Sequence, residues 1–376
     1  MDGNDDGVAI VHGRRLVMAG SNNYLGLAND PRVRDAAAAA IRTHGTSCTG
    51  SRVLNGNLRL HETLERELAD FFEAEAALVF PTGYQANLGA IYGLVREGDH
   101  VFLDAAVHAS LIDAARMSRG TVHLFTHNDA DDLAGQLGEI DSSTPCLVVI
   151  DGVYSMEGDL AELPKIAAVC DEYGATLLLD DAHGAGVLAD GRGTVAHFGG
   201  SANVPLRTLT FSKALASIGG AVLGPERVIN YLRHHSRPIM FSAASTPAAT
   251  AAALAALRVL REEPWRCARA IDIARRVRIE LSALGFDVGM SETPVVPVLL
   301  GRPEDSELAN QITVFSAYNR LLELGVYTNP ILPPAASPRL RTSFIATHTD
   351  DQIKSVIEAF AIFAVELAGT GSPAIA

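Results

Sequence analysis

The sequence predicts an α/β fold, with a parallel sheet covered by helices on both faces and a smaller α+β domain after it. Short apolar runs of strand length recur through the middle of the chain. Amphipathic stretches long enough to cross back over a sheet separate these runs, which is the rhythm of consecutive βαβ units. Nearer the C-terminus the pattern changes to long helices and isolated strands. The five strand-like runs are ALVF (77–80), HVFLD (100–104), VHLF (122–125), CLVVI (146–150) and TLLLD (176–180).

Turn and cap residues set the ends of several expected elements. The opening VAIVHGRRLVM turns near His12-Gly13, which predicts a short hairpin. Crossover helices are expected from Asp129 to Ile140 and from Leu163 to Tyr173. A longer helix is expected from Thr246 to Leu260, because Thr stands at the N-cap and Pro at the first helical position.

The C-terminal part should form its own α+β domain. We expect a helix over 265–284, strands in PVVPVLL (294–300) and RTSFIA (341–346), and a closing helix after Thr349. Thr349 and Gln352 form a capping-box pattern. The apolar face of the closing helix is expected to hold Ile353, Val356, Ile357, Phe360 and Leu367.

These patterns predict three segments. They are an N-terminal hairpin segment (1–30), a large α/β domain (31–264) and a small C-terminal α+β domain (265–376). The total of 376 residues fits two or three domains of roughly 150 residues each.

Composition excludes several classes of protein. With 48% hydrophobic and 20% charged residues the chain is an ordinary globular protein rather than a disordered one. Its formal net charge of -14 repels phosphate backbones, so nucleic acid is not an expected partner. No apolar run approaches the roughly 18 residues of a membrane span, and the acidic N-terminus does not resemble a secretion signal. The 4 cysteines form no CxxC pair, which argues against disulfides and a metal site and favours the cytoplasm.

Candidate chemistry follows the ends of the predicted strands, where ligands bind in open α/β sheets. Gly83 follows the first strand in a turn that leads into a helix, and helix N-termini hold phosphates. Asp180 ends the fifth strand and His183 follows it closely. Lys213 follows the strand-like RTLTF, and lysine is the residue that forms Schiff bases. Each feature alone has a plain structural explanation, but their order matches what pyridoxal phosphate requires: an anchor, a partner for its ring nitrogen and an amine.

Motifs over nearly the whole chain then resemble one family, the α-oxoamine synthases. They are SNNYLGLA, TGSRVLNG, HETLE, FPTGYQANLG, HAS, HND, GVYSMEGD, DDAHGAGV, TFSKA and LRTSFIATHT, between about Ser21 and Thr349. The resemblance implies a fold-type I pyridoxal phosphate transferase like aspartate aminotransferase, with a mostly parallel seven-stranded sheet. It also implies a homodimer with active sites shared between subunits.

The same motifs imply roles for cofactor-binding residues. Lys213 would bond the cofactor and then remove the substrate Cα proton, and Asp180 would pair with the pyridinium nitrogen. His108 would stack on the ring, and His183 would bind the phenolate oxygen. The remaining implied contacts are Gly83 and Tyr84 through their amides, Thr210 and Ser212 beside the phosphate, Ser155, and Ala243 where many relatives carry a threonine that reaches the neighbouring subunit's phosphate.

Substrate contacts are implied in the same way. Arg341 would hold the amino acid's carboxylate, assisted by Asn22 and Ser155. Ser51 occupies the place where glycine-selective aminolevulinate synthases carry threonine, and the smaller side chain leaves room for a β-carbon. We therefore expect serine or alanine as the amino acid, and an acyl thioester on coenzyme A or a carrier protein as its partner.

The implied reaction is a decarboxylative Claisen-type condensation that gives an α-amino ketone, CO2 and a free thiol. The GSR motif and Ala243 are most similar to the serine palmitoyltransferase branch. The alternatives are an 8-amino-7-oxononanoate synthase of biotin synthesis and a non-catalytic partner subunit, against which the presence of Lys213 counts. A plain aminotransferase is disfavoured by His183. Leu209 replaces a glycine that is common in the family, and the acyl chain length is left open.

Overall fold

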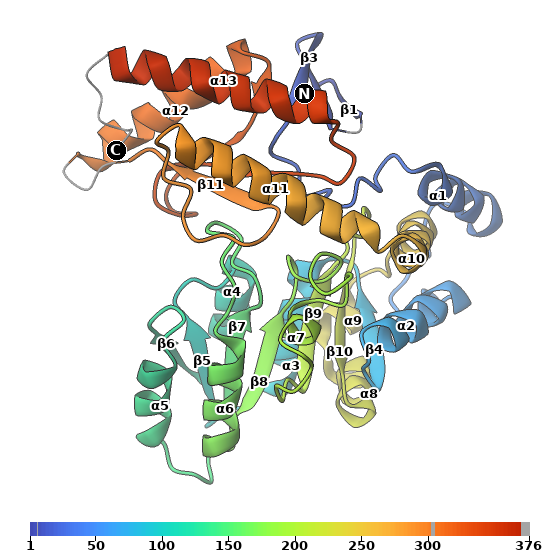
Figure 1. Cartoon of the computed structure of the whole chain (residues 1–376). Coiled ribbons are helices and arrows are strands. Elements are labelled where there is room, and N and C mark those ends of the chain that lie inside the picture. Colours follow the sequence, from blue (N-terminus) through green and yellow to red (C-terminus); the bar gives the residue numbers. More distant parts are fainter. Residues whose placement is uncertain (6, 302–304, 370–376) are drawn as a thin grey trace. The chain divides into compact units, whose positions relative to one another are not determined.

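All five strands expected in the middle of the chain form, and they belong to one sheet (Figure 1). The computed structural model describes residues 1–5, 7–301 and 305–369. The sheet has seven strands in the order β4-β10-β9-β8-β7-β5-β6. Its strands are β4 Ala76–Phe80, β5 His100–Asp104, β6 Thr121–Phe125, β7 Cys146–Asp151, β8 Thr176–Asp180, β9 Leu206–Thr210 and β10 Gly220–Gly224.

One strand of this sheet, β10, runs against the others. It pairs antiparallel with both β4 and β9, whereas the pairs among β5, β6, β7, β8 and β9 are parallel. The connection between β9 and β10 is too short for a crossover, so the chain can only return antiparallel. The predicted mostly parallel seven-stranded sheet is confirmed.

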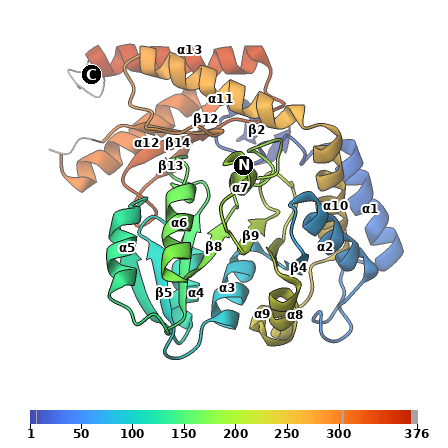
Figure 2. The same cartoon turned by 60° about the horizontal axis from the view of Figure 1, so that its bottom comes forward.

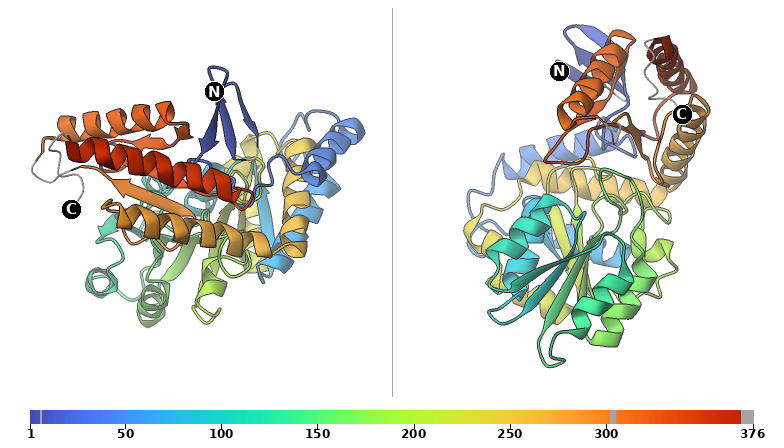
Figure 3. Two further views of the ribbon diagram at one scale, coloured as in Figure 1. Left: turned by 45° about the horizontal axis from the view of Figure 1, so that its top comes forward. Right: turned by 90° about the vertical axis from the view of Figure 1, so that its left-hand side faces the viewer.

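Helices cover both faces of the sheet, as Figure 2 and the right-hand view of Figure 3 show. One face packs against α3 Gly83–Leu94, α4 Ala109–Met117, α8 Glu226–His235 and α9 Arg237–Phe241, and its core includes Ile91 and Val222. The other packs against α5 Ala130–Gly138, α6 Leu163–Tyr173 and α7 Thr194–His197, with Leu133 and Ile166 in the core. Helices α1 Pro31–His44, α2 Arg59–Phe71 and α10 Pro247–Glu262 pack together, and α2 also contacts β4.

A second compact unit is built from three separate pieces of chain, 1–29, 155–159 and the described part of 265–376. It holds two small sheets, ordered β1-β2-β3-β12 and β11-β14-β13. The predicted hairpin forms with its turn at His12-Gly13, where both residues have positive φ (50° and 73°), as a tight hairpin turn of two residues requires. The strands of these two small sheets are β1 Gly3–Asp5, β2 Val8–Val11, β3 Arg14–Met18, β11 Val295–Leu299, β12 Val326–Tyr327, β13 Asn329–Ile331 and β14 Arg339–Ser343.

Three helices complete this second unit: α11 Trp265–Ala283, α12 Glu307–Glu323 and α13 Asp350–Gly369. The left-hand view of Figure 3 shows the three helices. The predicted capping box is present, since Gln352 Oε1 accepts from the Thr349 amide (2.8 Å) and Thr349 Oγ1 accepts from the Gln352 amide (3.2 Å). Ile353, Val356 and Phe360 are buried in the core, with Ile357 and Leu367 packed against it.

The other unit comprises residues 30–154 and 160–264 and contains the seven-stranded sheet. The three-segment division drawn from the sequence stays a prediction, and residues 370–376 of its last segment lie outside the described residues. Within the described ranges, no helix combines the length and the apolar character that crossing a bilayer would require.

Candidate active site

The carboxyl edge of the large sheet gathers four polar side chains into one hydrogen-bonded chain. Asp180 ends β8 and is buried; it accepts from Asn87 Nδ2 (2.6 Å) and from the Ala182 amide (3.0 Å). Asn87 Nδ2 also donates to Ser110 Oγ (2.9 Å). Ser110 Oγ in turn lies 2.7 Å from His108 Nδ1. A carboxylate and an imidazole on different elements are therefore held in a fixed relation.

His108 caps α4, because its Nδ1 also accepts from the Ser110 amide (3.2 Å). With Nδ1 accepting, the ring proton belongs on Nε2. His108 is exposed as a residue, yet desolvation by the surrounding protein lowers its pKa; the Asp180 charge opposes this shift and the Lys213 charge adds to it. The neutral imidazole is therefore favoured, and a neutral ring can stack on an aromatic ligand.

Lys213 belongs to the same group of charges. It lies just beyond β9 and is half-buried. Its ammonium lowers the pKa of both His108 and Asp151, which places it within electrostatic reach of the carboxyl edge. His183 is buried in the turn that follows Asp180. The sequence-predicted lysine, aspartate and two histidines thus lie on the segments that form this edge.

The N-terminus of α3 forms a cradle beside Thr210. A Cβ added to Gly83 would meet Thr210 Cβ and Oγ1 at 2.8 Å, and one added to Gly220 would lie 2.6 Å from Gly83 Cα. Thr210 Oγ1 lies 2.9 Å from Ser212 Oγ. Helix amides without an intrahelical acceptor and two hydroxyls are a donor set that suits a phosphate. The residues present therefore fit a ligand that has a phosphate, an aromatic ring and a group that reacts with an amine.

Tyr84 contributes to this cradle only through its backbone. Its side chain is exposed and its hydroxyl donates to the Asp113 carboxylate, which raises the pKa of Tyr84. Its amide lies in the first turn of α3, next to Gly83.

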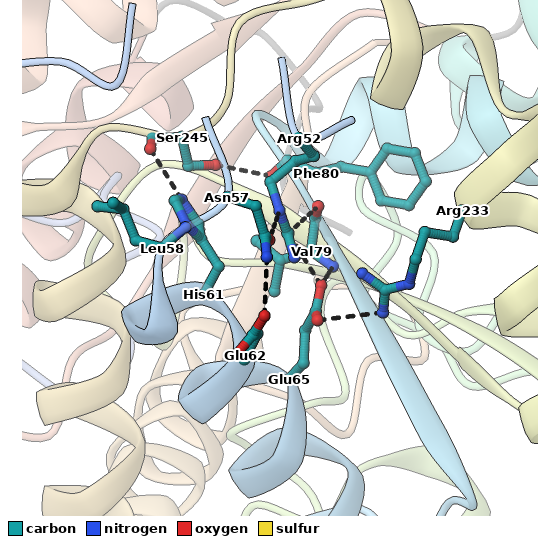
Figure 4. A network of polar contacts seen from close by, with 10 residues as sticks. All are labelled: Arg52, Asn57, Leu58, His61, Glu62, Glu65, Val79, Phe80, Arg233 and Ser245. Carbon is teal, nitrogen blue, oxygen red and sulfur yellow. Dashed lines mark hydrogen bonds and ion pairs between the residues drawn. The ribbon is translucent and has the colours of Figure 1, made fainter. Parts of the chain in front are cut away.

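A buried ionic network fixes the loop that carries Ser51 (Figure 4). Arg52 donates to Asn57 (2.7 Å) and pairs with Glu65 on α2 (2.9 Å). Glu65 also accepts from the Val79 amide of β4 (2.9 Å) and pairs with Arg233 (3.2 Å). Glu65 is held from three sides, and Arg52 is anchored through Nε and Nη1, so these contacts tie the loop to α2 and β4.

Ser51 itself is buried, and its hydroxyl has no hydrogen-bond partner among the described residues. His61 Nε2 lies 3.0 Å from the Ser245 carbonyl, as Figure 4 shows, so the same network holds the segment that includes Ala243. Ala243 is exposed.

In the other unit, three predicted substrate residues meet around one arginine. Arg341, on β14, is buried and donates through Nε to the Ser155 carbonyl (2.6 Å) and through Nη2 to Tyr24 Oη (3.3 Å). Tyr24 in turn donates to Asn22 Oδ1 (3.1 Å). Burial raises the pKa of Tyr24, although the nearby Arg341 charge opposes it, so the phenol stays neutral. A guanidinium, an amide and a phenol so arranged can recognise a carboxylate.

Sequence reasoning missed four of these residues: Asn87, Ser110, Tyr24 and Asp151. Asn87, Ser110 and Tyr24 lie inside quoted motifs, and Asp151 immediately precedes one. Position within a motif was therefore the available signal, whereas their partners come from elements distant in sequence.

Comparison with known proteins decides the family. The model of the aminotransferase class I and II family matches residues 15–360. The chain belongs to this family. It is 42% identical over 357 residues to a serine palmitoyltransferase of Sphingobacterium spiritivorum, covering 94% of this chain and 88% of the relative. It is 40% identical over 364 residues to an 8-amino-7-oxononanoate synthase of Symbiobacterium thermophilum, covering 96% and 91%.

A solved structure matches almost the whole fold. It is a lysine-to-alanine variant of serine palmitoyltransferase from S. paucimobilis with a bound PLP–myriocin aldimine, with a TM-score of 0.91, 34% identity and coverage of 98% of this chain and 92% of that one. The predicted family resemblance and the predicted fold-type I architecture are confirmed.

Proposed function

We propose that the protein is a pyridoxal phosphate-dependent α-oxoamine synthase that condenses L-serine or L-alanine with an acyl thioester. The products are an α-amino ketone, CO2 and the free thiol. The observation that carries this proposal is the grouping of Lys213, Asp180 and neutral His108 beside the Gly83 cradle. The names of the relatives support it, because both serine palmitoyltransferase and 8-amino-7-oxononanoate synthase are α-oxoamine synthases.

Pyridoxal phosphate, when bound, supplies an electron sink for negative charge that develops at the substrate Cα. Asp180 would hold the protonated ring nitrogen, and its hydrogen bonds from Asn87 and the Ala182 amide orient the carboxylate. The amides of Gly83 and Tyr84 and the hydroxyls of Thr210 and Ser212 would hold the phosphate. His108 would stack on the ring, and His183 would bind its phenolate oxygen.

Lys213 has two tasks in this proposal. Its Nζ would hold the cofactor, and its amine, in the unprotonated form, would accept the Cα proton.

Arg341 would bind the amino acid's carboxylate, with Asn22 and Ser155 beside it. Because the Ser155 carbonyl and Tyr24 hold Nε and Nη2, the guanidinium is oriented before substrate arrives. A carboxylate held in one orientation aligns the bond to CO2 that breaks after condensation.

Ser51 favours serine or alanine over glycine, since one methylene of pocket shape is worth about 1–3 kcal/mol. The unpartnered Ser51 hydroxyl and the fixed loop around it give this residue a defined place from which to act. Ala243 removes the hydroxyl that many relatives present to the neighbouring subunit's phosphate.

The protein should work as a homodimer in the cytoplasm. Leu54 is 78% exposed and Phe241 is 70% exposed in the unit that holds the large sheet, so both offer apolar surface that a partner subunit would cover. Within the described residues, Cys48, Cys146, Cys170 and Cys267 form no disulfide, which is compatible with a reducing compartment.

The decisive experiment follows the absorption of purified protein after addition of pyridoxal phosphate, then titrates glycine, alanine and serine. We expect the absorption band of a protein-bound imine, which Lys213→Ala abolishes without loss of far-ultraviolet circular dichroism. Absence of this imine band in the cofactor-saturated wild type would refute the proposal and favour a non-catalytic subunit.

A mixed pool of pimeloyl and long-chain thioesters with product mass analysis separates the two candidate activities. The 40% identity to an 8-amino-7-oxononanoate synthase keeps that enzyme as the second candidate. A pimeloyl-derived product from alanine would favour it, and a long-chain product from serine would favour serine palmitoyltransferase activity.

A further inference from the structure

Three neighbouring parallel strands of the large sheet each end in an aspartate. They are Asp104 on β5, Asp151 on β7 and Asp180 on β8. In the strand order, β7 lies between β5 and β8, so Asp151 stands in the middle. Asp151 and Asp180 are register partners, which places their Cα atoms about 4.8 Å apart with both side chains on one face. Buried carboxyl groups on adjacent strands cannot all be ionised without compensation.

The two outer aspartates are compensated. Asp104 accepts from His127 Nδ1 (2.9 Å), the Asn128 amide (2.8 Å), the Ala106 amide (2.8 Å) and Tyr154 Oη (2.8 Å). Burial raises the pKa of Asp104, but these hydrogen bonds outweigh burial and leave it below its ordinary value. Asp180 accepts from Asn87 and from the Ala182 amide.

Asp151 differs from both. It is buried, its Oδ2 accepts from the His108 amide (3.2 Å), and its Oδ1 has no hydrogen-bond partner within the described ranges. Burial and the neighbouring Asp180 charge raise the pKa of Asp151 well above its ordinary value; Asp104 adds to this shift, whereas Lys213 and the His108 amide oppose it. Burial and the Asp180 charge therefore both favour the protonated form of this carboxyl group.

We propose that Asp151 is a positioning residue of the cofactor site, which holds the backbone of His108 and sets the electrostatic environment of the Asp180 carboxylate. The inference deepens the proposed function and rests on it. This role does not require the Asp151 carboxyl group to contact the cofactor.

The first part of the role follows from the way His108 is held. Its amide is bound by Asp151, and its Nδ1 is bound by Ser110. These two contacts, from β7 and α4, define both the start of α4 and the plane of the imidazole. Loss of the Asp151 acceptor would leave a buried amide unsatisfied and free the ring to turn.

The second part concerns charge. A ring nitrogen that must stay protonated needs one carboxylate nearby, and Asp180 provides it. If Asp151 were ionised as well, its charge would repel that of Asp180 on the adjacent strand. A protonated Asp151 leaves the single negative charge on Asp180, where the Asn87 and Ala182 donors stabilise it.

The test compares Asp151→Ala with the nearly isosteric Asp151→Asn, and uses Asp181→Asn as a matched control. Asp181 is also buried just beyond β8, but it accepts from the Thr194 amide (3.0 Å) and Thr194 Oγ1 (2.6 Å) instead. Each full-length variant is freed of cofactor and titrated with pyridoxal phosphate. The readouts are the Kd, the visible circular dichroism of the bound cofactor, which reports ring orientation, and the thermal midpoint without cofactor.

We expect Asp151→Ala to raise the Kd for pyridoxal phosphate about tenfold and to weaken the visible dichroism, because a buried acceptor is lost. Asp151→Asn should keep most of the wild-type affinity and visible dichroism, since an amide oxygen can still accept from the His108 amide without adding charge. Asp181→Asn should leave dichroism and Kd as in the wild type.

An unchanged Kd and unchanged dichroism in Asp151→Ala would overturn the inference. It would also be overturned if Asp151→Asn bound pyridoxal phosphate as weakly as Asp151→Ala, because the negative charge itself would then be needed. If the wild type bound no pyridoxal phosphate, the proposed function would fail instead. The far-ultraviolet spectrum and thermal midpoint distinguish both results from misfolding.

Discussion

At the scale of single residues, the most informative contact in the smaller unit is made by Tyr24. Its hydroxyl receives a hydrogen bond from the Arg341 guanidinium and donates one to Asn22, so it links two of the proposed carboxylate-binding groups. It is buried and cannot exchange these bonds for water. Tyr24 therefore orients Arg341 rather than serving only as core.

Replacing that hydroxyl tests the link. Tyr24→Phe should raise the Kd for serine or alanine about three- to tenfold, because Arg341 loses one orienting partner while the ring still fills its space. Arg341→Ala should have a larger effect. Spectral titration of the cofactor-loaded protein measures both. A Tyr24→Phe variant with wild-type amino acid affinity would leave Tyr24 a purely structural role.

At the scale of elements, α3 and the end of β9 approach each other so closely that one added methyl group would disturb them. Gly83→Ala would push a methyl group into Thr210, so the cradle must open. We expect the Kd for pyridoxal phosphate to rise about tenfold, in line with the cost of overpacking a tight contact.

Gly135→Ala is the matched control for this change. Gly135 lies within α5, and an added Cβ there would meet nothing within 4 Å. The control should bind the cofactor normally and gain slightly in thermal midpoint, because alanine is the better helix former. Equal cofactor affinity in the two variants would contradict the assignment of the cradle.

The turn before α13 carries a different kind of prediction, one that concerns pH. Burial lowers the pKa of His348 to about 4, and its Nδ1 accepts from the Ile345 amide (3.2 Å). A histidine whose folded pKa lies below its ordinary value of about 6.5 stabilises the fold fully above that value, and the contribution is lost as pH falls towards 4. The total is on the order of 3 kcal/mol.

Urea unfolding between pH 7 and 4 measures this effect. We expect the wild type to lose stability more steeply over that window than His348→Asn, whose amide oxygen can replace Nδ1 as acceptor but does not titrate. Parallel profiles for the two proteins would assign the acid sensitivity to other groups.

Elements with a clear period or cap were predictable, and contacts across elements were not. The five apolar strands, the hairpin at His12-Gly13 and the Thr349 capping box follow from local pattern. Strand β10 was missed because GAVLG is short and glycine-flanked and carries no alternation. The role of Asp151 depends on the strand beside it, and a single chain sequence does not show which strands are neighbours.

The same reason explains why the proposed site was predictable only in part. Lys213, Asp180 and the two histidines lie in motifs that carry the family resemblance, whereas Asn87 and Ser110 are identified by the side chains that they join. The sequence also did not reveal that residues 155–159 belong to the same compact unit as the C-terminal part. That placement arises from contacts such as Arg341 with the Ser155 carbonyl, which sequence spacing does not reveal.

At the scale of the whole molecule, the exposed apolar surface bears on the proposed homodimer. In the unit with the large sheet, Leu54, Phe241, Met117 and Ile218 are all more than half exposed. Gln85, Leu88, Tyr92 and Met117 line a groove of about 280 Å³ together with Phe241. Such a surface is costly to leave in water, and a second copy of the chain would cover it.

A charge introduced at Phe241, which lines that groove, tests the proposed homodimer. Arg237 lies over the Phe241 ring, with its guanidinium carbon 4.9 Å from the ring centroid. Phe241→Asp would place a carboxylate on the proposed interface, and Ile279→Asp, at a side chain 58% exposed on α11 in the other unit, is the matched control. We expect sedimentation velocity to show a dimer for the wild type and for Ile279→Asp, and a shift towards monomer for Phe241→Asp, because burying an unpaired charge disfavours association.

The same variant tests whether the active sites are shared. Since Ala243 lies two residues from Phe241 and is implied to face the partner's cofactor, the monomer should also bind pyridoxal phosphate more weakly. A fully active monomer would contradict shared active sites.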